Sequence, residues 1–207
     1  DYNLPVNVPA NQFLNFEGDK FSKSRGWGIE QDEYLRVFEN FENKEDALRY
    51  ALIRNMPENK DSDFKWDDFV DFHDNELVAN VGNFINRVVV LTNKYFDGKV
   101  PSLSVNLKEL LAEVENLTQR LCQEIENFQF KPAIGTLMEI SSWGNTYLQD
   151  ASPWTIYKTE PESEKIKEAM LVSLQIVSLL GILTKPFLPF SSDKIQKLLN
   201  LPEVQDG

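Results

Sequence analysis

Three cationic and two hydroxyl side chains lie close together near the N-terminus of this 207-residue chain, which is otherwise acidic. The segment reads Lys20-Phe21-Ser22-Lys23-Ser24-Arg25-Gly26. Ammonium groups neutralise phosphate oxygens, and hydroxyl groups and backbone amides donate hydrogen bonds to them. The segment therefore has the chemistry of a polyphosphate-binding loop, although a solvent-exposed basic turn would carry the same residues.

An amide and a guanidinium form a second candidate group, in a helix predicted over residues 76–96. At about 100° per residue, Asn83 and Arg87 lie side by side along one edge of its apolar stripe. Together they offer donors and an acceptor to a nucleobase edge, and Trp154, directly after Pro153, offers a plane for stacking. Alternatively, Asn83 and Arg87 are ordinary boundary residues and Trp154 caps the end of a bundle.

The remaining reactive residue types do not form a site. His73 is the only histidine, so a histidine pair for a metal or a catalytic triad is excluded. The aspartates between 61 and 74 lack the glycine and glutamate spacing of a calcium loop, so we interpret them as a solvated acidic face. Cys122 is the only cysteine, which excludes an intramolecular disulfide and indicates a reducing compartment. We predict no metal site.

The net charge of -12 counts against a broad electrostatic grip on nucleic acid. The acidic excess is uneven, because residues 31–75 carry thirteen acidic and six basic residues whereas residues 76–207 carry sixteen and twelve. Stacking and a few directed hydrogen bonds can recognise an RNA base without a basic surface. We therefore expect local recognition with weak overall affinity.

Apolar residues at spacings of three and four predict helices over most of the chain. The predicted helices are two short ones within 31–53, one that begins near Ser62 or Asp63, and longer ones over 76–96, 107–125, 132–148, 162–183 and 191–199. The first thirty residues carry prolines and glycines without periodicity and are predicted to be irregular. Ala169–Leu183 is shorter than the roughly 20 residues of a membrane span, so we interpret it as a buried helix. The N-terminal DYNLPVNVPA lacks the regions of a signal peptide.

The lysine-containing segment resembles the KMSKS signature of class I aminoacyl-tRNA synthetases, with Phe21 in place of the usual methionine. Further blocks resemble the methionyl-tRNA synthetase family in the same order along the chain. They lie at 8–14, 48–58, 63–69, 75–87, 93–98 and 153–154. The leucyl, isoleucyl and valyl enzymes share the bundle and the loop, but Tyr95-Phe96-Asp97-Gly98 and Pro153-Trp154 favour methionine.

The resemblance implies an all-α fold in two parts. Residues 1–75 would be the KMSKS loop and stem-contact region, with an irregular N-terminal segment, and residues 76–207 the helical anticodon-binding domain. By resemblance, Lys20 and Lys23 are catalytic and contact the ATP phosphates with Ser22 and Ser24. Anticodon recognition falls to a set of four residues. They are Asn83, Arg87, Pro153 and Trp154.

The implied parent enzyme is a cytoplasmic methionine–tRNA ligase that uses ATP with Mg²⁺, of which this chain is a fragment that is inactive alone. Any zinc would belong to the catalytic region outside the fragment. The expected partners are the anticodon stem-loop of methionine tRNA and the catalytic domain, without membrane or DNA. The alternatives are a non-catalytic helical interaction module and the same fragment of a leucyl-, isoleucyl- or valyl-type enzyme.

Overall fold

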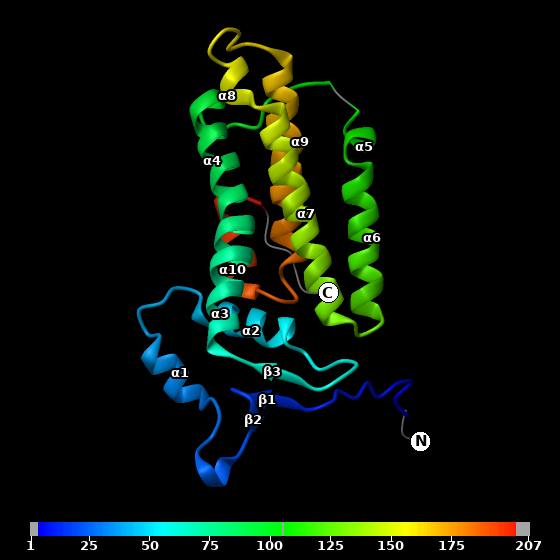
Figure 1. The fold of residues 1–207 in the computed structure, drawn as a ribbon. Helices are drawn as coiled ribbons and strands as arrows, with labels where there is room; N and C mark the ends of the chain where they lie inside the picture. The colour runs from blue at the N-terminus through cyan, green and yellow to red at the C-terminus, as the bar shows by residue number, and fades with distance from the viewer. Residues whose placement is uncertain (1–3, 105, 202–207) are drawn as a thin grey trace.

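The chain folds as an upright bundle of helices over a small layer that contains a short sheet (Figure 1). The computed structural model describes residues 4–104 and 106–201, and for Lys23 only the backbone. The predicted all-α class is confirmed, because the helices form the core and the described strands are short.

Three strands form the sheet, in the order β2-β1-β3. β1 (Leu14–Phe16) pairs antiparallel with β2 (Asp19–Lys20) and parallel with β3 (Ser62–Phe64). The β1–β2 turn places Glu17 and Gly18 at φ values of 50° and 81°, as two-residue hairpins require. The sequence does not predict this hairpin, because strands of two or three residues leave no alternating pattern.

Two short helices follow, α1 (Gln31–Val37) and α2 (Lys44–Arg54), which confirms the prediction over 31–53. They pack with the sheet around a small aromatic-rich core. Its buried members are Phe16, Tyr34, Ala47, Ala51, Phe64 and Phe69. Tyr50, also on α2, is instead part of the bundle core, so this one helix contributes to both.

One long helical rod connects the small layer to the bundle. It consists of α3 (Trp66–Asp71), the π-helix η2 (Phe72–Gly82) and α4 (Asn83–Phe96), with helical backbone angles at both junctions. The short helix predicted to begin near Ser62 or Asp63 is present as α3, but it begins at Trp66 with Lys65 at its N-cap, so the predicted start is wrong. Ser62 instead donates to the Asn55 carbonyl at the end of α2, and Asp63 accepts from the Gly18 amide of the β1–β2 turn, so neither side chain caps α3.

The remaining helices complete the bundle. They are α5 (Leu107–Leu110), α6 (Ala112–Glu126), α7 (Phe130–Ala151), α8 (Pro153–Ile156), α9 (Glu164–Leu183) and α10 (Pro189–Leu198). α9 is long and apolar enough to cross a membrane, yet 56% of its apolar window is buried inside the protein. The interpretation of Ala169–Leu183 as a buried core helix is consistent with that burial. The predicted boundary between 75 and 76 falls inside η2 and stays a prediction.

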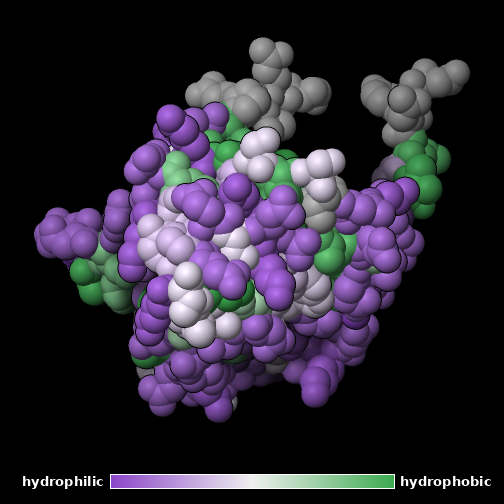
Figure 2. Space-filling view, turned by 90° about the horizontal axis from the view of Figure 1, so that it is seen from above, coloured by the Kyte–Doolittle hydropathy of each residue, from purple (hydrophilic) through white to green (hydrophobic). Residues whose placement is uncertain are grey.

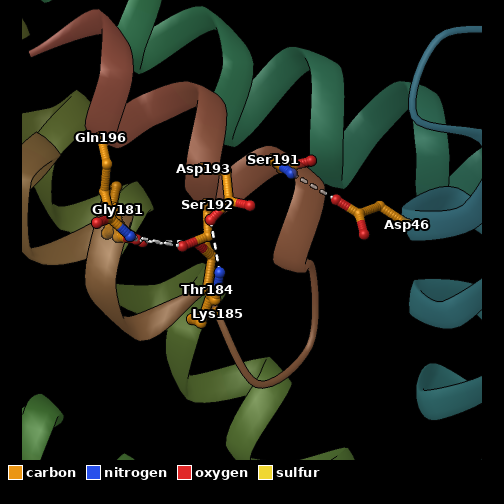
Figure 3. Close-up of polar contacts among 9 residues, drawn as sticks. Asp46, Gly181, Thr184, Lys185, Ser191, Ser192, Asp193 and Gln196 are labelled. Atoms are coloured by element: carbon orange, nitrogen blue, oxygen red, sulfur yellow. Dashed lines mark hydrogen bonds and ion pairs between the residues drawn. The ribbon is translucent and has the colours of Figure 1, made fainter. Parts of the chain in front are cut away.

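α10 is fixed at its N-terminus by side chains of α2 and by a backbone carbonyl of α9. Asp46 Oδ2 accepts from the Ser191 amide at 2.6 Å, and Arg49 donates to the Phe187 carbonyl at 2.9 Å. Figure 3 shows Asp46 reaching Ser191, while Ser192 donates to the Gly181 carbonyl of α9. These bonds connect the small layer directly to the C-terminal helix.

Helices α4 and α7 approach closely where Phe84 faces Gly144. Phe84 is fully buried, and a Cβ at position 144 would lie 2.5 Å from its ring. Only glycine therefore allows this contact. Gly135 lies earlier in the same helix, and a Cβ added at that position would have no atom within 4 Å.

We predict that Gly144→Ala destabilises the fold by about 2 kcal/mol, since overpacking a core costs roughly 1–3 kcal/mol. The matched control, Gly135→Ala, is expected to stabilise α7 by about 0.5–1 kcal/mol because alanine replaces glycine in an open helical position. Urea unfolding followed by circular dichroism measures both. Equal effects of the two substitutions would contradict the predicted Phe84 contact.

The buried phenol of Tyr34 and the half-buried phenol of Tyr147 predict that the fold loses stability in alkali. Burial raises the pKa of Tyr34 to about 12, with a smaller contribution from Glu45, and burial with a smaller contribution from Glu168 raises the pKa of Tyr147 to about 12. The unfolded chain releases these protons near the ordinary value of 10.0. The stabilisation is thus complete below about pH 10 and is lost as the pH rises towards 12.

Absorbance of tyrosinate during a pH titration, paired with unfolding curves, tests this expectation. Replacing Tyr34 and Tyr147 by phenylalanine should flatten the alkaline fall in stability. An unchanged pH profile in the double variant would show that other groups control it.

Candidate functional site

Arg87 and Trp154 meet at the upper part of the bundle. The guanidinium carbon of Arg87 lies 5.1 Å from the Trp154 ring centroid, within cation–π range. Arg87 also donates to Gln149 Oε1 at 3.0 Å. Both Arg87 and Trp154 are half-buried, so each retains surface that a ligand can reach.

Trp154 reaches this position because the chain turns sharply between α7 and α8. Ser152 adopts left-handed backbone angles of 37° and 56°, and the buried Pro153 starts α8 in the next position. Proline suits the first position of a helix because that residue needs no amide hydrogen bond there. The predicted pair Pro153-Trp154 therefore works as a unit, in which the proline directs the indole towards α4.

Asn83 is exposed and lies one turn before Arg87, at the first position of α4. Among the described residues its side-chain amide has no hydrogen-bond partner. The i, i+4 spacing places the amide on the same helix edge as the guanidinium. The structure thus brings Arg87 to Trp154 in direct contact, and Asn83 borders this pair without contacting it.

A row of polar side chains holds η2 against α7, and the sequence did not predict a role for it. Asn80 donates to Ser142 Oγ at 2.9 Å and to the Met138 carbonyl at 3.2 Å. Asn145 donates back to the Asn80 carbonyl at 3.0 Å. Ser142, Asn145 and Gln149 recur at spacings of three and four along α7. This spacing indicates a polar edge of the helix and could have predicted the contact.

Aromatic rings continue the surface beyond Trp154. Tyr95, near the end of α4, stacks on Tyr157 with centroids 4.1 Å apart, and Lys94 Nζ lies 5.7 Å from the Tyr95 centroid. Seen from above, the molecule is mainly hydrophilic with small apolar patches (Figure 2). This face therefore shows scattered apolar side chains rather than one broad apolar surface.

The lysine-containing segment forms a compact turn at the opposite end of the molecule (Figure 1). It runs from Lys20 at the end of β2 through a 3-10 helix, Lys23–Arg25, and closes by a bridge between Ser22 and Trp27. The hydroxyls of Ser22 and Ser24 lie 3.3 Å apart. Two predicted phosphate contacts thus lie side by side, whereas the side chain of Lys23 is outside the described part of the structure.

Neighbouring groups fix the base of this turn. Phe21 stacks on Phe16 with centroids 5.5 Å apart, so its ring anchors the turn to β1. A hydrogen bond from the Lys20 amide, followed by the charge of Arg25, holds the pKa of Asp19 below its usual value. The Arg25 guanidinium lies 3.3 Å from Asp19 Oδ2 in an ion pair. Lys20 Nζ lies over the Phe13 ring, 5.8 Å from its centroid.

Within residues 4–104 and 106–201, no three histidine, cysteine or acidic side chains gather as metal ligands do.

Two families match the chain. The one described as tRNA synthetases class I (M) matches residues 1–89, and the one described as anticodon binding domain of methionyl tRNA ligase matches residues 99–206. The chain belongs to the methionyl-tRNA ligase family. The predicted family resemblance is confirmed, and it is favoured over a leucyl-, isoleucyl- or valyl-type fragment and over a non-catalytic helical module.

Similar proteins support the same assignment. The chain is 47% identical to a methionine–tRNA ligase of Flavobacterium johnsoniae over 99% of its own length, and 49% identical to one of Christiangramia forsetii over 97%. It spans 29% of the length of each of these relatives. A Mycobacterium tuberculosis methionyl-tRNA synthetase in complex with methionyl-adenylate superposes with a TM-score of 0.81 at 26% identity, covering 93% of this chain and 38% of that one.

Proposed function

We propose that this chain is the part of a methionine–tRNA ligase that reads the anticodon of methionine tRNA and supplies a lysine loop to the ATP phosphates. The observation that carries the proposal is the contact of Arg87 with Trp154, beside the amide of Asn83, which has no hydrogen-bond partner among residues 4–104 and 106–201. The lysine loop lies in the small layer, at the opposite end of the molecule from this contact (Figure 1). A ligase that uses ATP and reads a tRNA needs two such separate sites.

The reading end offers two complementary interactions to an unpaired base. Trp154 supplies a stacking plane, worth roughly 1–3 kcal/mol per base. Asn83 and Arg87 supply donors and an acceptor to the base edge, as in RNA loops whose bases are splayed out. Pro153 fixes the direction of the indole, so it supports recognition without touching the base edge itself.

At the loop, Lys20 and Lys23 would contact the phosphates of ATP and stabilise the charge that develops on the leaving pyrophosphate. Ser22 and Ser24 would donate hydrogen bonds to the same oxygens. Mg²⁺ is expected to arrive with the nucleotide, and any zinc would belong to the catalytic region of the whole enzyme. The loop alone is expected to be inactive.

The whole enzyme would form methionyl adenylate from methionine and ATP, release pyrophosphate, and transfer the methionyl group to its tRNA. We expect this work in the cytoplasm, without membrane or DNA partners. The acidic residues 31–75 oppose general attraction to RNA, so the isolated chain should bind tRNA weakly.

Trp154→Ala and Arg87→Ala in the full-length enzyme are each expected to lower aminoacylation about 10- to 100-fold, the equivalent of one lost stacking contact. Pyrophosphate exchange, which needs no tRNA, should be unchanged. Arg120→Ala is the matched control, because Arg120 is a surface arginine of α6 paired with Glu139. Equal losses in both assays would contradict the anticodon role.

Lys23→Ala is expected to cut pyrophosphate exchange itself by about 10²–10³, since it removes a charge aimed at the developing phosphate charge. Lys60→Ala removes an exposed lysine outside the loop and serves as the control. Exchange at the wild-type rate in the Lys23 variant would refute the phosphate role while leaving the anticodon proposal intact.

A further inference from the structure

Helix α8, which carries Trp154, is too short to hold its own position. It spans Pro153–Ile156, and Tyr157 closes its turn by donating its amide to the Pro153 carbonyl at 2.9 Å. A single turn of this kind is unstable alone, because nucleating a helix costs more free energy than one or two hydrogen bonds provide. Among the described residues, no hydrogen bond joins 153–160 to α4. The direction of the indole therefore depends on side-chain packing.

Two ring contacts join α8 and the residue that follows it to α4, beside whose upper end α8 lies (Figure 1). The first is the contact of Arg87 with Trp154. The second is the stack of Tyr95 on Tyr157, in which the ring planes are 21° from parallel. With centroids 4.1 Å apart, this is the closest ring pair in the part of the chain that the structure describes.

The two contacts lie at different heights on α4. Arg87 and Tyr95 are eight residues apart, which corresponds to about 12 Å along the helix axis. A single contact would let α8 pivot about it, so that the indole could move off the guanidinium. The second contact removes this rotation, and stacked aromatic rings contribute stabilisation beyond the apolar area that they bury.

We propose that Tyr95 and Tyr157 are positioning residues, which clamp α8 to α4 so that Trp154 stays over Arg87 and can stack on an unpaired base. The inference rests on the proposed anticodon role and extends it to two residues that need not touch the RNA. Both rings are half-buried, and neither hydroxyl makes a hydrogen bond to another described residue. Phenylalanine at either position should therefore replace tyrosine, whereas alanine should not.

Fluorine nuclear magnetic resonance of the chain labelled with 5-fluorotryptophan tests the clamp without tRNA. Trp154→Phe identifies the Trp154 signal among those of the four tryptophans. Tyr157→Ala is expected to move this signal towards that of free 5-fluorotryptophan in water, and Tyr157→Phe should leave it in place. Tyr147→Ala is the matched control, because Tyr147 is also half-buried and stacks on Trp143 with centroids 5.3 Å apart. The control should move the Trp143 signal instead.

Aminoacylation by the full-length enzyme tests what the clamp does. Tyr157→Ala should raise the KM for tRNA about 2- to 10-fold, the range that corresponds to the loss of one aromatic pair, with kcat and pyrophosphate exchange unchanged. Added to Trp154→Ala, it should cause no further loss, because no indole is then left to position. A purely structural role would instead give losses that multiply in the double variant.

Tyr95→Ala breaks the same stack from α4, so it keeps the inference testable if Tyr157→Ala fails to fold. An unmoved Trp154 signal in a folded alanine variant, or multiplied losses in the double variant, would overturn the clamp. Wild-type aminoacylation by Trp154→Ala would refute the anticodon role instead, and the Trp154 signal would still decide whether the two tyrosines position the indole.

Discussion

The contact of Phe84 with Gly144 is the constraint on which the upper half of the molecule depends. A buried ring on α4 occupies the space that any side chain at 144 would need, so the two helices approach at one fixed register. Amide contacts from Asn80 and Asn145 on one side, and the Arg87 contact with Gln149 on the other, reinforce that register. Interior packing at this density transmits small displacements, so the guanidinium keeps its place relative to the indole.

The two ends of the molecule are joined by side chains rather than by a flexible linker. α2 contributes Tyr50 to the bundle core and Ala47 to the small core, and its Asp46 and Arg49 hold the start of α10. Tyr50 and Arg54 also both donate to Glu76 of η2. The lysine loop is thus attached to the same rigid set of helices as the contact between Arg87 and Trp154.

Much of this arrangement follows from local pattern, and the rest depends on distant partners. The apolar stripe of α4 and the shared edge of Asn83 and Arg87 could be predicted, because helical periodicity alone fixes them. The approach of Trp154 to Arg87 was expected from the family resemblance alone, because local pattern does not predict the left-handed Ser152 on which it depends. The hydrogen bond from the Ser191 amide to Asp46 joins residues 145 positions apart, and no local pattern predicts it.

The π-helix η2 lets one continuous rod serve two cores. A π turn holds more residues than an α turn, so the eleven residues of η2 change the direction in which successive side chains point. Phe69 before it faces the small aromatic core, and Phe84 after it faces the bundle. The wider π turns rotate the side chains between the two cores without a break in the helix, so the position of α4 and its Arg87 is fixed relative to the small layer.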